Sequence, residues 1–276
     1  MKNLLNKLVP ALVVGSLFAA CQKKFDESTY APKLNIGGYT SSDEIATSNL
    51  VAYWSFDNTL TESKSTTAGT STGSGFGGGL KGSAATFSGN SYIVSNTPTV
   101  LQGLKSFTVT MWVKANQNTV GIAGLMDIAN TNSFWGNMTV FFENGGSADV
   151  AKLKIHVNNN GADGWLGNYD LNKIWGVWTH IAVSYDAATS TFRVYSNGSK
   201  IATQVQAGFG NLVFQNATKM SFGTVQFQTT PSLTTNHGKE TWADYLNGSL
   251  DEVRVYNIAL SDNDITSLMK LEGKGK

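Results

Sequence analysis

Short segments in which apolar and polar side chains alternate recur along most of this chain, and no other feature restricts its fold as strongly. In residues 107–113 every second position is apolar, with Phe107, Val109, Met111 and Val113. Residues 179–185 repeat the pattern with Ile181, Val183 and Tyr185. Because successive side chains of a β-strand point to opposite faces, each segment predicts a strand with one face in a core.

Further candidate strands lie between turn-forming residues, at 84–87, 91–94, 139–142, 153–157, 192–196, 200–203, 220–222 and 249–256. Asn197-Gly198 separates two of them and suits a tight hairpin turn. Residues 71–79 are mostly Gly, Ser and Thr, cannot fill a core, and predict a loop. Ser261, followed three residues later by Asp264, predicts a capped short helix at the C-terminal end. No long amphipathic helix interrupts the strands, so the predicted class is all-β.

The N-terminal residues have the pattern of a secretory signal peptide. Lys2 and Lys7 precede an apolar stretch at 8–18, and the small residues Ala19 and Ala20 follow it. This stretch is shorter than the roughly 20 residues needed to cross a bilayer. We therefore expect residues 1–20 to be a signal peptide and the protein to be exported.

Cys21 is the only cysteine, so no intramolecular disulfide can form. Residues 17–21 resemble a bacterial lipobox, which implies acylation of Cys21 and a membrane contact through the lipid anchor only. The alternative is an ordinary cleaved signal with a cysteine near the cut. Residues 21–49 are polar and aperiodic and predict a flexible tether. Its charged beginning resembles the surface-export signals of Bacteroidetes lipoproteins, which implies an outer-membrane lipoprotein at the cell surface.

The remaining residues, 50–276, can form one β-sandwich domain. The net charge is +1 and charged residues make up only 14% of the chain. No basic field is present to gather phosphates, so nucleic acid is not an expected partner. An uncharged partner fits better.

Five motifs in order resemble the laminin-G-like domains, which are jelly rolls of the concanavalin A-like lectin/glucanase type. They lie at 50–57, 106–114, 178–186, 195–198 and 246–257, and a segment with Ala259-Leu260-Ser261 and a helix follows. The resemblance covers nearly all of residues 50–271. It implies two antiparallel sheets packed face to face, of which one is concave and often carries the ligand.

Catalytic residues are not expected. Related glucanases carry a Glu-x-Asp-x-Glu run on one strand, and no such run is present. A retaining glycosidase needs two carboxyl groups about 5 to 5.5 Å apart. Asp251 and Glu252 are adjacent and should point to opposite faces of a strand, whereas Asp163 and Asp170 lie in a Gly/Asn-rich segment that predicts a loop.

The three histidines have no visible catalytic partners or zinc-ligand spacing. His180 and His156 are expected to be structural hydrogen-bonding residues. His237 falls in a polar segment and is expected at the surface.

Calcium is the one metal considered, since it takes oxygen ligands that the rim loops of a sandwich can offer. In similar jelly rolls the positions of Asp57 and Asp251 approach each other because the first and last strands pair. A structural Ca²⁺ at these two residues is one expectation. The alternative expectation is that Asp57 starts a turn and that Asp251 makes hydrogen bonds or a salt bridge.

The tryptophans divide into two groups. Trp54, Trp112 and Trp178 belong to strand motifs and are expected to pack in the core or on a sheet face. Trp135, Trp165 and Trp242 lie in predicted loops, where an exposed ring beside amide and carboxylate groups can stack on a sugar. The candidate ligand-binding residues are Trp135, Trp165, Tyr169 and Trp242. The alternative is that these rings close the ends of the sandwich.

Three functions follow from these observations. A non-catalytic carbohydrate-binding surface lipoprotein is the first. A module that adheres to a cell-surface or matrix protein is the second, and it predicts a broad, flat contact surface. A divergent glycoside hydrolase is the third, with Asp163, Asp170 and Asp244 as the acids to test.

Overall fold

The computed structural model describes residues 34–118 and 120–276. The chain divides into two units, Met1–Leu34 and Asn35–Lys276, and the second contains all the strands that the structure describes. The expected signal peptide at 1–20 and Cys21 lie outside the described residues. Among the described residues, no helix is long and apolar enough to cross a membrane.

Two sheets packed face to face form the second unit, and each contains eight of the described strands. The order in the first sheet is β13 (Ser199–Val205), β12 (Thr191–Ser196), β11 (Thr179–Asp186), β6 (Phe107–Ala115), β16 (Gly248–Tyr256), β4 (Ser83–Phe87) and β3 (Gly75–Gly78), with β1 (Leu50–Trp54) also paired to β16. The order in the second sheet is β10 (Ala162–Asn172), β9 (Val150–Asn159), β8 (Met138–Asn144), β7 (Ile122–Ile128), β14 (Lys219–Phe222), β5 (Tyr92–Asn96) and β2 (Gly69–Thr72), with β15 (Ala243–Asp244) also paired to β7.

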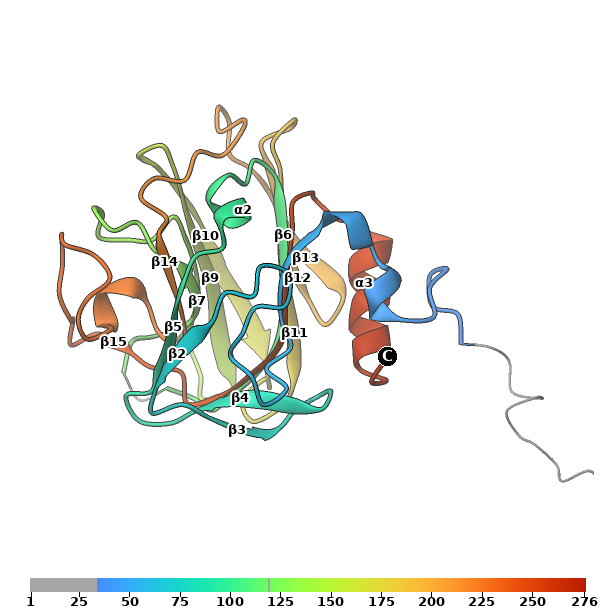
Figure 1. Ribbon diagram of the computed structural model, residues 1–276, viewed down its shortest axis with the longest axis horizontal. Coiled ribbons are helices and arrows are strands. Elements are labelled where there is room, and N and C mark those ends of the chain that lie inside the picture. Colours follow the sequence, from blue (N-terminus) through green and yellow to red (C-terminus); the bar gives the residue numbers. More distant parts are fainter. Residues whose placement is uncertain (1–33, 119) are drawn as a thin grey trace, which may run out of the picture. The chain divides into compact units, whose positions relative to one another are not determined.

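Neighbouring strands run antiparallel, except that β15 runs parallel to β7. The helical elements are short: η1 (Ser42–Glu44), η2 (Thr47–Asn49), α2 (Thr99–Gln102), η3 (Gln226–Gln228) and α3 (Asp262–Glu272). Figure 1 shows the two sheets with α3 outside the first sheet, and with the orange segment beside β15 outside the second. The predicted all-β, two-sheet antiparallel sandwich with a short C-terminal helix is confirmed.

The core lies between the sheets, where alternate side chains of the facing strands meet. Phe107, Val109 and Met111 of β6 point inward, as their alternation predicts, and all are buried. The ring of Trp54 from β1 reaches the second sheet and lies 5.1 Å from the ring of Phe222. Burial of such rings is the main favourable contribution to joining the two layers.

Helix α3 begins at the predicted cap. The Ser261 hydroxyl accepts a hydrogen bond from Asp264 N, and the Asp264 carboxylate accepts one from Ser261 N, so the capping box is complete. Trp112, on the outer face of β6, donates its Nε1–H to Glu272 Oε2 at the end of the helix over 2.8 Å. The helix therefore covers the outer face of the first sheet.

A buried arginine joins this helix to the sheet. Arg254 of β16 bonds Glu272 Oε1 (2.8 Å) and Glu252 Oε2 (2.9 Å), and its guanidinium lies 4.1 Å from the centre of the Tyr53 ring. It also reaches Asp43 in η1 at 3.1 Å. Residues 35–49 thus pack on the same face as α3. The compact unit begins at Asn35, earlier than the expected boundary at residue 50, because these contacts attach the segment to the sandwich.

Two expected loops are strands. The Gly/Ser/Thr-rich segment at 71–79 contains the second half of β2 and all of β3, which pair with β5 and β4 at the edges of the two sheets. These edge strands do not have to fill the core, so small residues suffice. At Gly77 a larger residue would crowd the side chain of Thr86, because a Cβ there would lie 2.9 Å from Thr86 Cγ2. The segment with Asp163 and Asp170 is β10, paired along its length with β9.

His180 also differs from expectation. Its ring packs edge-on against Trp112 with centroids 5.2 Å apart. Neither ring nitrogen has a hydrogen-bond partner among the described residues, so His180 is a packing residue rather than a hydrogen-bonding one. Burial lowers the pKa of this imidazole to about 3.

Candidate functional site

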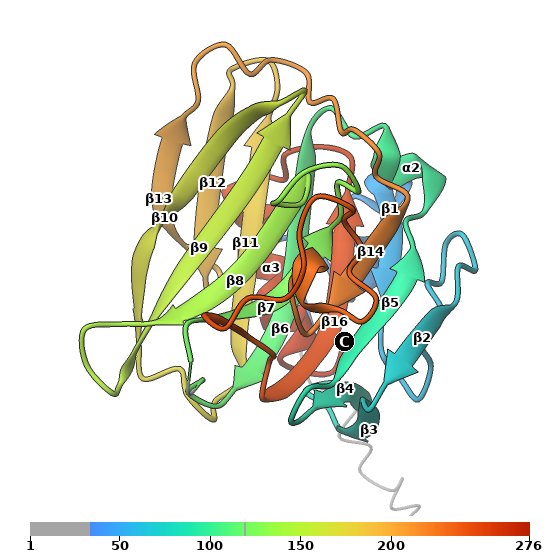
Figure 2. The same ribbon diagram turned by 90° about the vertical axis from the view of Figure 1, so that its left-hand side faces the viewer.

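The outer face of the second sheet carries aromatic side chains where a strand exposed to water would normally carry polar ones. On β8, Phe142 points into the core and Phe141 points outward. On β10, Trp165 stands opposite His156 of β9, and the two rings are 4.5 Å apart. Figure 2 shows β10, β9, β8 and β7 side by side, with the orange and red segment after β14 crossing in front of β7.

Two loops add further rings to this face. The loop between β7 and β8 supplies Phe134 and Trp135, and the segment from η3 to β15 supplies Phe227 and Trp242. Trp135 is the central ring: its centroid lies 5.0 Å from Trp165, 5.6 Å from Phe141 and 6.2 Å from Trp242. We call this set the aromatic platform; it consists of Phe134, Trp135, Phe141, Trp165, Phe227 and Trp242.

The platform has a buried base and an exposed top. Phe141 and Phe227 are buried, and Phe134 and Trp135 are half-buried. Trp165 and Trp242 are 44% and 40% exposed, which is unusual for large rings that already touch aromatic neighbours. The structure thus contains features of both alternatives considered from the sequence. Phe134, Trp135, Phe141 and Phe227 fill space, whereas the rings of Trp165 and Trp242 face water.

A buried polar pair holds the two loops together beneath the rings. Gln226 donates from Nε2 to the carbonyls of Ser133 (2.7 Å) and Phe134 (2.9 Å). Its own amide N–H donates to Asp127 Oδ2 on β7 over 2.9 Å. A Cβ at Gly136 would lie 2.0 Å from Asp127 Oδ1, so only glycine fits there. These bonds fix the backbone that carries Phe134 and Trp135 against the segment that carries Phe227.

Polar groups border the platform. His156 Nε2 lies 2.9 Å from Asp163 Oδ1, and Asn158 Nδ2 donates to the same oxygen over 2.8 Å. Burial lowers the pKa of His156, so the ring is neutral at pH 7 and can donate to the carboxylate. His237 bonds Glu240 on the other side, and its ring centroid lies 4.4 Å from that of Phe134. The exposed Asp163 and the half-buried Glu240 thus place carboxylate oxygens at two borders of the platform.

The four predicted ligand-binding residues separate into two groups. Trp135, Trp165 and Trp242 meet in the platform, although Trp165 lies on strand β10 rather than in a loop. Tyr169 does not join them. An irregularity in the pairing between Leu166 and Tyr169 shifts the register, so Tyr169 stands opposite Leu153 and packs against the core between the sheets.

The sequence pattern did not point to Phe134, Phe141 or Phe227 of the platform, nor to His156 at its border. A signal existed for Phe141, because it is an aromatic residue at the outward position of β8, next to the core residue Phe142. The others depend on which strands and loops become neighbours. The pattern of a single segment does not contain that information.

The two predicted calcium ligands, Asp57 and Asp251, accept hydrogen bonds from the backbone of one turn, at residues 80–83. Asp57 Oδ1 accepts the N–H of Ser83 (2.7 Å), and Asp251 Oδ2 accepts those of Leu80 (2.7 Å) and Lys81 (3.1 Å). Burial raises the pKa of Asp251 to about 7. Among the described residues, no group of three or more His, Cys, Asp or Glu side chains is arranged to hold a metal. The hydrogen bonds give both carboxylates a role in the turn, and calcium stays a prediction.

Two carboxylates of the hydrolase hypothesis, Asp163 and Asp170, lie far apart. Asp163 pairs in register with Asn158, and Asp170 with Lys152, so six residues of β9 separate them. At roughly 3.3 Å per residue this is about 20 Å, against the about 5 to 5.5 Å of a retaining pair. Asp170 bonds Lys152 Nζ over 2.7 Å. At Asp251 and Glu252 the alternation of faces does not apply, because the pairing with β6 is irregular there and Glu252 has a φ of 50°.

The fold, with one sheet covered by a helix and the other bearing exposed rings, defines a jelly-roll β-sandwich of the concanavalin A-like class. Residues 87–266 match the family Laminin_G_3, described as the concanavalin A-like lectin/glucanases superfamily. The chain belongs to this family. No curated protein matches it.

Several solved structures share the fold. Domain 4 of AbnA, a GH43 extracellular arabinanase from Geobacillus stearothermophilus in complex with arabinotriose, is 24% identical, with a TM-score of 0.53 over 80% of this chain and 98% of that one. The binding domain of botulinum neurotoxin serotype G is 12% identical, with a TM-score of 0.60 over 81% and 51%. That of neurotoxin DC, in complex with rat synaptotagmin II, is 14% identical, with a TM-score of 0.59 over 83% and 52%. The chain spans about half the length of these neurotoxin domains.

Proposed function

We propose that this protein is a non-catalytic carbohydrate-binding module whose ligand stacks on the aromatic platform. The observation that carries the proposal is the pair of exposed rings, Trp165 and Trp242, on either side of Trp135. Sugar rings have apolar C–H faces and hydroxyl edges, so they match aromatic faces bordered by polar acceptors. Asp163 and Glu240 supply such acceptors at the border.

The structural neighbours support a binding role. AbnA domain 4 was solved with arabinotriose, and another neurotoxin structure is described by the interaction of that toxin with two ganglioside molecules. The wide separation of the acids on β10 favours capture over hydrolysis. The neurotoxin DC domain binds a protein, so adhesion to a protein is the outcome that competes in the test.

The proposal includes display at the cell surface. It rests on the lone Cys21, preceded by small residues and an apolar stretch, and on the resemblance of residues 17–21 to a lipobox. In this arrangement the protein is exported, acylated at Cys21 and held on the outer membrane.

A glycan array probed with the purified full-length chain tests the proposal. Trp165→Ala and Trp242→Ala should each weaken binding about two- to tenfold, because stacking on a large ring contributes on the order of 0.5 to 1.5 kcal/mol. Phe76→Ala is the matched control, since Phe76 is a comparably exposed ring on β3.

Selective binding that the two tryptophan variants lose and the control keeps supports the proposal. A blank array from folded protein, or release of reducing sugar that disappears in Asp163→Asn, overturns it. The first result moves the assignment to protein adhesion and the second to a hydrolase.

A further inference from the structure

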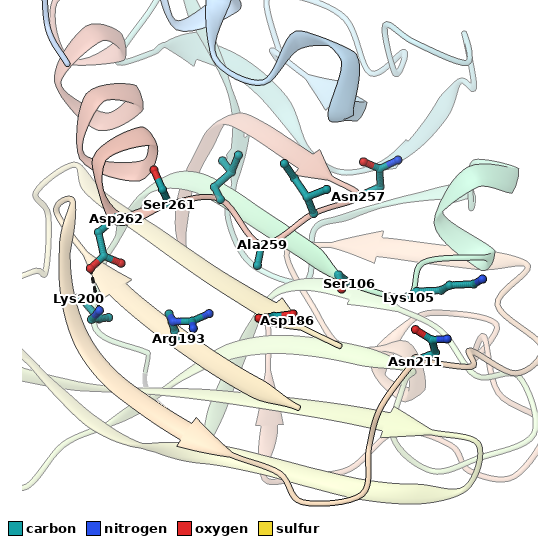
Figure 3. A pocket seen from close by; sticks show the side chains of 12 residues that line it. Lys105, Ser106, Asp186, Arg193, Lys200, Asn211, Asn257, Ala259, Ser261 and Asp262 are labelled. Carbon is teal, nitrogen blue, oxygen red and sulfur yellow. Dashed lines mark hydrogen bonds and ion pairs between the residues drawn. The ribbon is translucent and has the colours of Figure 1, made fainter. Parts of the chain in front are cut away.

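A second concave surface lies on the opposite sheet, away from the aromatic platform. It is a groove of ≈ 810 Å³ on the outer face of the first sheet, between strands β11 to β13 and the segment 257–262 that leads into α3. Its volume lies within the roughly 300 to 1,000 Å³ of small-molecule sites. Figure 3 shows Arg193 between Asp186 and Lys200 on one side of the groove, and Ala259 facing them from the other.

The acids of this groove already have partners. Asp262 accepts the Tyr195 hydroxyl and the Lys200 ammonium, one on each oxygen and each over 2.7 Å. These bonds lower the pKa of Asp262, so it stays ionised. Asp186 accepts Ala188 N on one oxygen and the Thr189 hydroxyl on the other, each over 3.0 Å.

Two cations of the groove, Arg193 and Lys105, differ from these acids. The guanidinium of Arg193 makes no hydrogen bond and no ion pair within 4 Å to any residue that the structure describes, although its charge helps to lower the pKa of the neighbouring Asp262. The Lys105 ammonium makes neither kind of contact to a described residue. Arg193 stands on β12 opposite Ser184, on the outer face of the strand, and is partly accessible to solvent. Its five N–H donors are therefore available to a ligand in the groove.

The remaining wall suits a sugar ring. Ile258, which is 36% exposed, and the partly exposed Ala259 supply apolar surface along the segment before α3, and Leu260 next to them is buried. Asn211 adds an amide near Lys105 at the other end. The groove thus combines a planar cation, a flexible cation and an apolar wall.

We propose that this groove binds the carboxylate or sulfate group of an acidic sugar, with Arg193 as the main contact and Lys105 as the second. A guanidinium fork matches both anions, because two parallel N–H groups can donate to two oxygens of one group. Lys200 takes no direct part, since Asp262 already neutralises it. The site is separate from the platform and does not depend on the function proposed for it.

Calorimetric titration of the full-length chain tests the site. The probes are a tetramer of galacturonic acid and its fully methyl-esterified form, and a sulfated galactose oligomer and its desulfated form. We expect both acidic probes to bind and both neutral forms to bind at least about tenfold more weakly, with affinity falling between about 50 and 300 mM NaCl. The stronger acidic probe identifies the anion.

Three variants separate this site from other sources of binding. Arg193→Gln should lower affinity for the acidic probe about tenfold or more, and Arg193→Lys should recover only part of it because the fork is lost. Lys270→Gln, which removes an exposed cation of α3, should have no effect. Trp165→Ala should also leave acidic binding intact.

Several outcomes overturn the proposal. They are equal affinity for acidic and neutral probes, full affinity in Arg193→Gln, or loss of acidic binding in Trp165→Ala, which would assign it to the platform. Displacement of the acidic probe by an equal concentration of inorganic sulfate would show an anion site without sugar recognition. The proposal is supported if Arg193→Gln removes binding of the acidic probe while Lys270→Gln and Trp165→Ala keep it. This outcome does not depend on the result of the glycan array.

Discussion

Asp127 lies beneath the aromatic platform with both carboxylate oxygens enclosed by protein. Oδ2 accepts Gln226 N, and Thr139 Oγ1 lies 3.3 Å from the same oxygen. Oδ1 has no hydrogen-bond partner among the described residues. Burial raises the pKa of this carboxyl to about 7, against the opposing effect of the two hydrogen bonds.

The raised pKa predicts how stability changes with pH. Between pH 4 and 7 the folded state keeps a proton on Asp127 that the unfolded chain releases, so the free energy of unfolding should fall as pH rises through this window. The difference between this pKa and that of an unfolded aspartate corresponds to a loss of about 4 kcal/mol as an upper figure. Asp127→Asn resembles the protonated form at every pH, so the variant should lack this part of the decline in the free energy of unfolding. Urea unfolding at pH 4.5 and at pH 7.5 measures the decline in both proteins.

Asp170→Asn is the control for that measurement, because Asp170 is exposed and its side chain pairs with Lys152. Asp251 contributes a decline in the same direction, since burial raises its pKa to about 7 too, so part of the pH dependence should remain. An Asp127→Asn variant with the full wild-type decline would contradict the prediction.

At the scale of elements, the prediction from sequence succeeded where one face of a strand is buried and the other is polar. β6, β11 and the β12–β13 hairpin agree with their patterns, as does α3 with its cap. It failed for β7, which is buried on both faces and shows no alternation, and for β10, whose glycines and asparagines resemble a loop.

The attachment of α3 depends on a charge cluster that is fully buried. Arg254→Met leaves Glu252 and Glu272 in the interior without their cation, which should destabilise the fold by about 3 to 5 kcal/mol. Urea unfolding measures the loss, and hydrogen exchange should show the amides of α3 opening first. Arg193→Met is the matched control, because that arginine has no ion pair with a described residue and should change stability by about 0.5 kcal/mol or less. A loss below about 1 kcal/mol for Arg254→Met would refute the role.

At the scale of the whole molecule, the sandwich could be predicted from sequence and the platform only in part. Three of the four predicted ligand-binding residues meet there because β10 and two loops converge on one face. Convergence depends on strand order, which a pattern within one segment does not specify. Tyr169 was misplaced for the same reason, since the register shift after Leu166 turns it inward.

Calcium can be tested on the intact protein. If Asp57 and Asp251 hold Ca²⁺, a chelator should lower the Tm and calcium should restore it, since calcium at about 100 times its Kd would stabilise the fold by roughly 2.7 kcal/mol. The effect should weaken below pH 7, where Asp251 becomes protonated. Asp57→Asn, at an exposed position, should abolish the response. An identical Tm with chelator and with calcium would refute the site.

The positions of residues 35–49 and of the platform have a mechanical consequence. The segment packs with α3 on the outer side of the first sheet (Figure 1). The platform lies on the outer face of the second sheet. A pull between residue 35 and a ligand on the platform therefore runs through both layers. The contacts of Arg254 with Asp43 and Tyr53 join residues 35–49 and β1 to the first sheet, so this force acts on them first. The hydrogen bonds between β1 and β16 then transmit it to the rest of the sheet. The buried arginine is thus placed to resist tearing of the N-terminal strand from the domain under tension.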